Sequence, residues 1–168
     1  KIESHTEYMK NYKVMPIDYE RHYENREWYY TIIWESSEYG NGGSYGWSLR
    51  YSHEKNNFLN DVNSMDNLGY YPIDIEIHYY GKKYGGAFTS KPLSYLLFWD
   101  QNYDDIVSNI NDAKSSGYSP VDIEIYENEG VKKYAGILTL DSNEWDYVLD
   151  VSPEEFSQKN TLMQNSGY

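Results

Sequence analysis

Apolar and polar residues alternate along two segments that each begin with Gly-Tyr-x-Pro. Residues 69–77 read Gly-Tyr-Tyr-Pro-Ile-Asp-Ile-Glu-Ile, and residues 117–125, 48 positions later, read Gly-Tyr-Ser-Pro-Val-Asp-Ile-Glu-Ile. Residues 14–20 carry a weaker copy, Val-Met-Pro-Ile-Asp-Tyr-Glu. A period of two residues indicates a β-strand with two chemically different faces. The chain therefore contains an internal repeat, in which a strand follows the proline.

A helical pattern of apolar residues precedes the alternating strand in the second and third repeats. Apolar residues at i, i+4 and i+7 lie on one helix face, and they recur as Phe58, Val62 and Met65 and as Ile106, Ile110 and Ala113. Gly69 and Gly117 follow at positions where a helix end favours positive φ. Residues 152–155, Ser-Pro-Glu-Glu, have the form of an N-cap followed by proline and first-turn acids. We therefore expect a further helix near the end of the chain.

Two more strands complete each predicted unit. A short polar turn leads from the alternating strand to a second strand, at residues 84–89 and 134–140. Aromatic and apolar segments at residues 47–51, 95–99 and 145–149 predict a third strand. Each unit is thus expected to contain, in order, a helix, a hairpin and a strand.

The expected fold is α+β, with three helix–β–β–β units plus a final helix. The units span about residues 1–52, 53–100 and 101–151 of a single repeat-built domain (1–168), and residues 152–168 form the start of a fourth unit. We expect the strands to form a curved antiparallel sheet with the helices on one face, as a half-barrel or a pseudo-threefold arrangement. In that arrangement Phe58, Ile106 and Phe156 occupy equivalent positions.

The same pattern resembles the bacterial tandem-repeat modules found beside serine hydrolase domains, including those of fungal polyglycine hydrolases. The resemblance is carried by residues 117–125 and by Lys-Tyr-Ala-Gly-Ile-Leu-Thr at residues 133–139, which is similar to the family's Tyr-Ala-Ala second strand. The chain departs from the family before the proline, where Met15, Tyr71 or Ser119 replaces the usual Arg. The resemblance implies a non-catalytic accessory module of an exported protein, hence an extracellular or cell-surface location. It does not supply a ligand.

Composition narrows the functional classes. The chain has 27 acidic against 14 basic residues, a net charge of −13, which disfavours nucleic-acid binding and docking on anionic lipid. No apolar run approaches the length of a membrane-spanning helix, so we expect no membrane insertion. The absence of cysteine excludes disulfides and thiolate metal sites. Twenty-one Tyr and five Trp supply apolar area for a core and leave some rings exposed.

The most regular polar feature is a ladder of acids on the alternating strands: Asp18, Glu20, Asp74, Glu76, Asp122 and Glu124. One interpretation is a row of oxygen ligands for Ca²⁺, or a surface that mimics a polyanion. The other is a solvated strand face whose acids pair across the hairpin with Lys82, Lys83, Lys132 and Lys133. The lysines recur with the acids, as pairing requires, so we favour the solvated face and predict neither a metal site nor a cofactor.

No constellation of residues predicts catalysis. Residues 52–55, Ser-His-Glu-Lys, fit the Ser-x-x-Lys pattern of serine hydrolases, but such a match is expected by chance here and no Lys-Thr-Gly accompanies it. Ser52 is better interpreted as the N-cap of the helix that follows. His22 and His78 share a repeat position, but the third unit has Tyr126 there, which argues against a histidine metal site.

The first unit carries eight extra residues between its second and third strands, within residues 36–47. The two sister units close the same connection without them, so packing alone does not require the insertion. Loops on a rigid sheet commonly carry recognition. We predict a ligand-binding site built from the stacking rings and hydrogen-bonding groups of this loop, with a plain spacer as the alternative: Tyr39, Asn41, Ser44, Tyr45 and Trp47.

The predicted function is a non-catalytic binding or adhesion module that recognises a surface glycan, peptide or protein partner through exposed Tyr and Trp. The rival hypothesis is an acidic inhibitor or immunity-type protein that covers a basic partner surface, because a net charge of −13 suits electrostatic steering. The chain begins at Lys1 without a signal-peptide pattern, so we expect a processed or truncated start.

Overall fold

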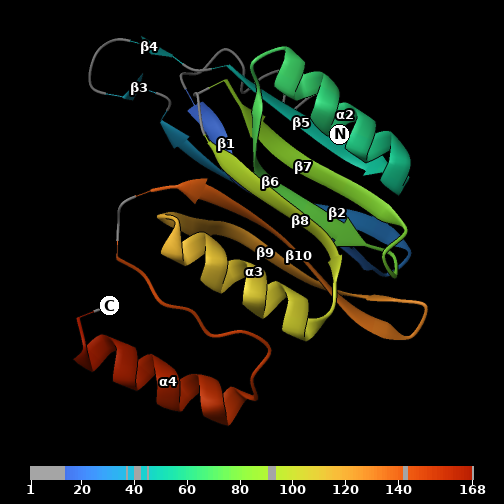
Figure 1. Cartoon of the computed structure of the whole chain (residues 1–168). Coiled ribbons are helices and arrows are strands. Elements are labelled where there is room, and N and C mark those ends of the chain that lie inside the picture. Colours follow the sequence, from blue (N-terminus) through green and yellow to red (C-terminus); the bar gives the residue numbers. More distant parts are fainter. Residues whose placement is uncertain are drawn as a thin grey trace.

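The described chain forms two three-stranded antiparallel sheets and two small hairpin sheets, with helices beside them (Figure 1). The computed structural model describes residues 14–36, 38–39, 43–44, 46–90, 94–141 and 144–167. This part of the chain contains three helices and ten strands, so the α+β fold class is confirmed. None of its helices has the length and apolar character needed to cross a membrane. The helix expected at the start of the first unit lies outside the described residues.

The N-terminal part of the described chain is a long hairpin followed by a small one. β1 (Val14–Glu24) pairs antiparallel with β2 (Glu27–Ser36). β3 (Glu38–Tyr39) and β4 (Gly43–Ser44) then form the small hairpin. The small hairpin occupies the insertion that distinguishes the first unit from its sister units.

The next four elements form the first three-stranded sheet and its helix: β5 (Trp47–His53), α2 (Lys55–Asn67), β6 (Tyr71–His78) and β7 (Lys83–Thr89). β7 is the middle strand, with β5 and β6 at the edges. Gly69 has a φ of 77°, and this left-handed backbone lets the chain leave α2 and enter β6. The expected apolar face of α2 is buried, as Phe58, Val62 and Met65.

The following four elements have the same order: β8 (Tyr95–Gln101), α3 (Tyr103–Ser115), β9 (Tyr118–Asn128) and β10 (Val131–Leu140). β10 is the middle strand, so both sheets are ordered first, third, second along the chain. Gly117 has a φ of 81° after α3, in the same role as the glycine after α2. The expected apolar face of α3 is also buried, as Ile106, Ile110 and Ala113.

The aromatic third strand belongs to the hairpin that follows it, which corrects the helix–β–β–β order expected from the sequence. β5 pairs with β7, and β8 pairs with β10, so each of these strands joins the hairpin that lies after the next helix. The order of elements in one sheet is therefore β–α–β–β. In Figure 1 the chain leaves β5, runs through α2 and returns to the same sheet as β6 and β7.

The prediction of an aromatic strand at residues 145–149 is wrong, because residues 144–149 have no regular secondary structure. The physical reason is pairing: β5 and β8 each bond to a later hairpin, whereas residues 144–149 form no ladder with any strand in the described part of the chain. The segment docks through its side chains instead. The indole Nε1 of Trp145 donates a hydrogen bond to the carbonyl oxygen of Tyr118 over 3.0 Å, and Leu149 joins the buried cluster of Ile106.

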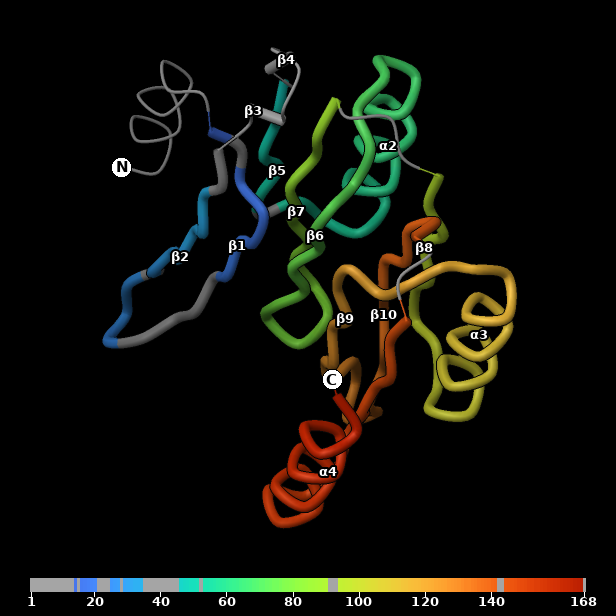
Figure 2. The backbone as a smooth tube through the Cα atoms, turned by 90° about the vertical axis from the view of Figure 1, so that its left-hand side faces the viewer, coloured from blue at the N-terminus to red at the C-terminus, as the bar shows by residue number. Residues whose placement is uncertain are grey.

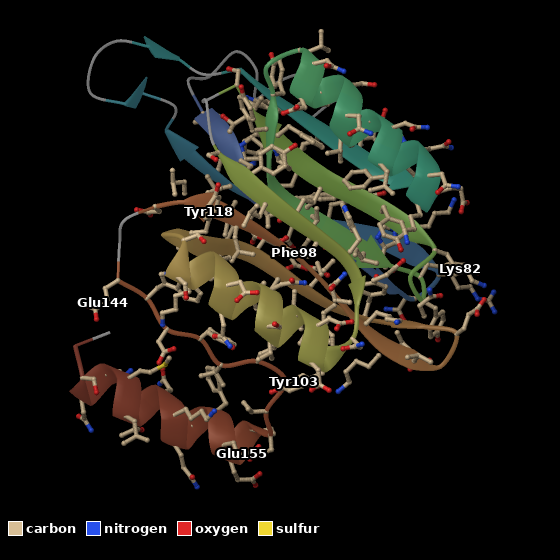
Figure 3. The ribbon with its side chains drawn as sticks, viewed as in Figure 1. Lys82, Phe98, Tyr103, Tyr118, Glu144 and Glu155 are labelled. Carbon is tan, nitrogen blue, oxygen red and sulfur yellow. The ribbon has the colours of Figure 1, made fainter. Side chains whose placement is uncertain are left out.

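α4 (Pro153–Asn165) begins as the sequence predicts. The Ser152 hydroxyl accepts a hydrogen bond from the N–H of Glu155 over 3.2 Å, and the Glu155 carboxylate accepts one from the N–H of Ser152 over 3.0 Å. This reciprocal pair is a capping box, which satisfies two N–H groups at the helix start. Glu155 is labelled at the start of α4 in Figure 3.

The packing of α4 differs from that of the other two helices. Phe156 is 56% exposed, whereas Phe58 and Ile106 are fully buried, so the expected equivalence of these three positions is wrong. The strands that follow α2 and α3 pack against these two helices, whereas α4 has no buried residue. Figures 1 and 2 both show α4 set apart from the sheets.

The described strands form separate small sheets rather than the single curved sheet expected from the sequence. β6 and β9 are edge strands of their sheets, and β6 lies next to both β1 and β9 without forming a ladder with either (Figure 2). The first strands of the three hairpins therefore converge. Apolar packing also joins the two large sheets, because Trp99 of β8 meets Phe58 of α2 edge to face at 5.8 Å between ring centroids.

Candidate functional site

Three strands carry the motif Pro-x-Asp-x-Glu, and the structure brings these strands together. The motif occupies residues 16–20 of β1, 72–76 of β6 and 120–124 of β9. In each strand the pairing register skips the residue after the proline, which places a β-bulge at Ile17, Ile73 and Val121. A bulge re-aims the side chains that follow it, and bulges are common next to functional sites. The Asp and the Glu of each motif are those side chains.

The acids of β6 point away from α2 and toward the β1 hairpin. Ile75 packs in the buried cluster beneath α2, so the alternating side chains of Asp74 and Glu76 lie on the opposite face of the strand. The cross-strand neighbour of Glu76 is Gly85. A Cβ atom added to Gly85 would lie 3.2 Å from Cε1 of Tyr19, so the glycine leaves the space into which β1 packs.

Aspartates of one hairpin bind the strand edge of the preceding hairpin. The N–H of Tyr19 donates to Oδ1 of Asp74 over 3.4 Å, and the N–H of Ile75 donates to Oδ2 of Asp122 over 2.8 Å. Each donor directly follows the aspartate of its own motif, so the two hydrogen bonds are equivalent. An edge strand leaves outward N–H groups unpaired, and burial of such a group requires an acceptor. The aspartates supply these acceptors and thereby join the three strands.

The glutamates of the three motifs meet at one point. Glu20, Glu76 and Glu124 each place one carboxylate oxygen within 4.8 Å of the other two. Glu76 is buried, Glu124 is half-buried and Glu20 is exposed, so the meeting point is open to solvent on the β1 side. We refer to the six motif acids as the carboxylate cluster: Asp18, Glu20, Asp74, Glu76, Asp122 and Glu124.

Burial makes the ionised form of these acids costly. Burial, and next the nearby charge of Asp122, raise the pKa of Asp74 to about 9. The same two causes raise the pKa of Glu124 to about 10. The pKa of Asp122 rises to about 6, because burial outweighs the hydrogen bond from the N–H of Ile75. In the absence of a cation, Asp74 and Glu124 therefore bind protons at neutral pH.

The preference for a solvated acidic face, drawn from the sequence, is wrong. The acids of β6 are buried, and two of the lysines expected to pair with the ladder bind other acids. Lys83 Nζ lies 2.6 Å from Glu54, and Lys132 Nζ lies 2.8 Å from Asp150. The reason is register, because Lys83 stands beyond Glu76 at the outer end of its hairpin. Alternation shows which residues share a strand face, but not whether another hairpin covers that face.

These raised pKa values predict that the chain becomes more stable as the pH falls, when divalent cations are removed by a chelator. The native pKa values of Asp74 and Glu124 lie above the ordinary values of 3.8 and 4.5. The native state therefore binds more protons than the unfolded chain between these limits, and stability is lost as the pH rises toward about 9. We expect Tm, measured by calorimetry, to be higher by about 5 °C at about pH 6 than at about pH 9.

The double variant Asp74→Asn, Glu124→Gln is the control for this pH dependence. It removes both titrating groups and nearly preserves their shapes, so its Tm should vary much less over the same pH range. Self-repulsion among the other charged residues acts on both proteins alike. Equal slopes in the wild type and the variant would contradict the assignment to these two acids.

The ligand-binding loop predicted from the sequence lies largely outside the described residues. Asn41 and Tyr45 are not among them. The backbones of Tyr39 and Ser44 lie in β3 and β4, the two strands of the small hairpin, and their side chains are outside the description. A role of these four residues in binding stays a prediction.

Trp47, the fifth predicted site residue, is half-buried at the start of β5. Its ring meets the ring of Trp34 edge to face, with 5.1 Å between the centroids. It also packs against the buried cluster that contains Tyr19 and Leu49. Trp47 therefore joins β5 to the β1–β2 hairpin through a packing contact.

The sequence also suggested an N-cap role for Ser52 and a shared repeat position for His22 and His78. The N-cap residue of α2 is Glu54, so the interpretation of Ser52 as that N-cap is wrong. The side chain of His22 is outside the described residues, so its pairing with His78 stays untested. Nδ1 of His78 lies 4.0 Å from Oε1 of Glu76, which places an imidazole beside the carboxylate cluster.

Comparison with protein families links one segment of the chain to a known repeat. Residues 97–138 match the model of a family described as a polyglycine hydrolase-like structural repeat, which confirms the resemblance drawn from the sequence. The match begins within β8 and ends within β10, so it follows the β–α–β–β order of one sheet. The description as a structural repeat agrees with a non-catalytic role. Comparisons with curated proteins and with solved structures gave no match.

Proposed function

We propose that the chain is a non-catalytic binding module of an exported, cell-surface or extracellular protein. Its partner is a glycan, a peptide or a protein surface, recognised through exposed tyrosines. The family match supports the non-catalytic part of this proposal, because the matching repeat is described as structural. The proposed binding role is supported by the conformation and exposure of the turn that joins β6 to β7.

The β6–β7 turn exposes two adjacent tyrosines in an unfavourable backbone conformation. Tyr79 and Tyr80 are 59% and 68% exposed, and their φ angles are 54° and 56°. Positive φ is rare and costly for bulky residues other than glycine. The corresponding turns of the sister hairpins place smaller or charged residues there, Asn25-Arg26 and Glu129-Gly130. Packing does not require tyrosine at this turn, and backbone strain of this kind is concentrated at functional sites.

The turn is held against the neighbouring sheet, so the two rings are presented outward. A Cβ atom added to Gly81 would lie 3.1 Å from both Tyr126 and Asn128 of β9. The rings of Tyr79 and Tyr80 have centroids 6.3 Å apart and planes inclined by 58°. Lys82, labelled in Figure 3, belongs to the same turn at the outer edge of the molecule. Two outward phenol rings suit contact with sugar rings or peptide groups, because each offers an apolar face and a polar tip.

The double variant Tyr79→Ala, Tyr80→Ala tests this proposal. Immobilised peptidoglycan and a glycan and peptide array, both in high salt, provide the candidate partners. We expect the wild type to bind a member of these panels and the double variant to bind it at least about tenfold more weakly, as for the loss of an aromatic hot spot. The affinity is measured by surface plasmon resonance or titration calorimetry.

Tyr29→Ala is the matched control, since Tyr29 is an exposed tyrosine of β2 that does not belong to the β6–β7 turn. It should leave the affinity unchanged. An unchanged affinity in the double variant would contradict a role for the turn. Tight, salt-sensitive capture of a basic protein with no glycan or peptide binding would instead support the acidic-inhibitor hypothesis.

A further inference from the structure

We propose that the carboxylate cluster is a binding site for a divalent cation, and that its geometry fits Ca²⁺. The site lies where β1, β6 and β9 meet, so a single ion would be held by all three hairpins. The proposal is independent of the partner contact assigned to the β6–β7 turn.

The three glutamate oxygens lie close enough together to bind one Ca²⁺ ion. One oxygen from each of Glu20, Glu76 and Glu124 lies within 4.8 Å of the other two. Ca²⁺ binds oxygen at about 2.3–2.6 Å, so ligands on opposite sides of the ion are at most about 5 Å apart. Mg²⁺ binds at about 2.0–2.1 Å and demands near-ideal octahedral geometry, so carboxylates fixed on three separate hairpins suit the more adaptable coordination of Ca²⁺ better. A donor set made only of carboxylate oxygens also favours a hard cation over Zn²⁺.

Asp74 provides a second and independent observation. This residue is 4% exposed. Its Oδ1 accepts the N–H of Tyr19, but its Oδ2 is buried and has no hydrogen-bond partner within the described part of the chain. Strand residues two positions apart point to the same side, so the carboxyl groups of Asp74 and Glu76 face the same space. A buried oxygen without a partner is unfavourable, and a cation in this space would satisfy it.

The charges of the described residues also favour a bound cation at this site. Six acids converge, while Lys83 and Lys132, two of the four lysines expected to pair with them, bind acids outside the cluster. The imidazole of His78, 4.0 Å from Glu76, carries at most one positive charge. Buried carboxylates need compensating charge or protons. A divalent ion at the meeting point of the glutamates supplies two charges to ligands from three strands at once.

The site also has an entry path. Glu20 is exposed, whereas Glu124 is half-buried and Glu76 is buried. An ion can therefore reach the cluster from the β1 side without unfolding of the hairpins. Glu20 would be the outermost ligand and Glu76 the innermost.

The test uses the full chain after removal of metal with a chelator. Calcium chloride is titrated into the protein in a calorimeter, and Tm is measured with and without the ion. We expect a Kd in the range of about 10⁻⁵–10⁻³ M and a rise in Tm of about 5 °C near saturation. Magnesium chloride at the same concentration should give a smaller rise. Tb³⁺, which replaces Ca²⁺ and emits when nearby tyrosines are excited, should emit in the complex until Ca²⁺ displaces it.

The variant Glu20→Gln separates binding from folding, because an exposed side chain contributes little to the core. We expect it to bind Ca²⁺ at least about tenfold more weakly than the wild type. Glu127→Gln is the matched control: Glu127 is an exposed acid of β9, three residues after Glu124, and its substitution removes the same charge. This control should bind Ca²⁺ as the wild type does.

Two results would overturn the proposal. Absence of calcium heat, of Tb³⁺ emission and of any Tm shift in the wild type would mean that protons alone neutralise the cluster. An equal loss of affinity in Glu20→Gln and Glu127→Gln would mean that Ca²⁺ only associates with the acidic surface. A selective loss in Glu20→Gln supports the site.

Discussion

The variant Phe58→Ala is expected to lose about 3–5 kcal/mol of unfolding free energy, the cost of truncating a fully buried aromatic side chain. Its ring contacts Tyr84 and Phe88 of the first three-stranded sheet, at 6.2 and 6.3 Å between centroids. It also contacts Trp99 of the second sheet at 5.8 Å. Truncation therefore leaves a cavity where α2 meets both sheets. Urea unfolding, followed by tryptophan fluorescence, measures the loss.

Phe156→Ala is the matched control, because Phe156 has the same position in the repeat but lies on α4. Its side chain is 56% exposed, so we expect a loss below about 1 kcal/mol. A comparable loss in both variants would contradict the packing difference between α2 and α4. It would mean that the face of α4 is buried in solution.

The variant Gly86→Ala is expected to destabilise the first three-stranded sheet by about 3 kcal/mol, at the upper end of overpacking costs. An added Cβ would lie 2.4 Å from the backbone carbonyl oxygen of Asp74 and 3.2 Å from Cζ of Phe58. A backbone atom of the paired strand cannot rotate away, so β6 must move relative to β7. The same movement would displace Asp74 and weaken the carboxylate cluster. Urea unfolding measures the stability, and the Ca²⁺ titration measures the effect on the cluster.

Gly136→Ala tests the same repeat position in the second three-stranded sheet. There the added Cβ would meet Cδ1 of Ile123 at 2.7 Å, and the nearest backbone oxygen, that of Asp122, lies at 3.3 Å. The half-buried Ile123 side chain can change rotamer, so we expect a smaller loss of about 1 kcal/mol. If Gly136→Ala were the more damaging variant, the close approach of β6 to β7 would not be the cause.

Part of the carboxylate cluster could be predicted from the sequence. Alternation placed the motif acids on one face of each strand, and their spacing in the repeat made them equivalent. The prediction was wrong in expecting water, and not another hairpin, to cover that face. One signal was available in the cross-strand partners: Glu76 faces Gly85, and Glu124 faces Ala135. Small residues opposite acids leave space that another hairpin can fill, which a solvated face does not require.

The strained tyrosine turn could not be predicted in the same way. The site predicted from the sequence lies in the insertion of residues 36–47, because an insertion is visible in the repeat spacing. The turn at Tyr79 and Tyr80 follows the alternating strand without any sign that both residues adopt positive φ. Backbone conformation at such a turn depends on how the two strands are paired, which the residue types do not specify.

The amino-acid sequence by itself determined the local structure of this protein. The buried faces of α2 and α3, the glycines with positive φ after them and the capping box of α4 depend on residues a few positions apart, so local patterns reveal them. Only the tertiary structure decided which strand joins which hairpin. β5 and β8 pair beyond the next helix, and the acidic faces of β1, β6 and β9 meet each other, with Glu76 buried and Glu20 still exposed. These contacts join residues far apart in the sequence, and the alternation of a strand is the same whichever partner covers it.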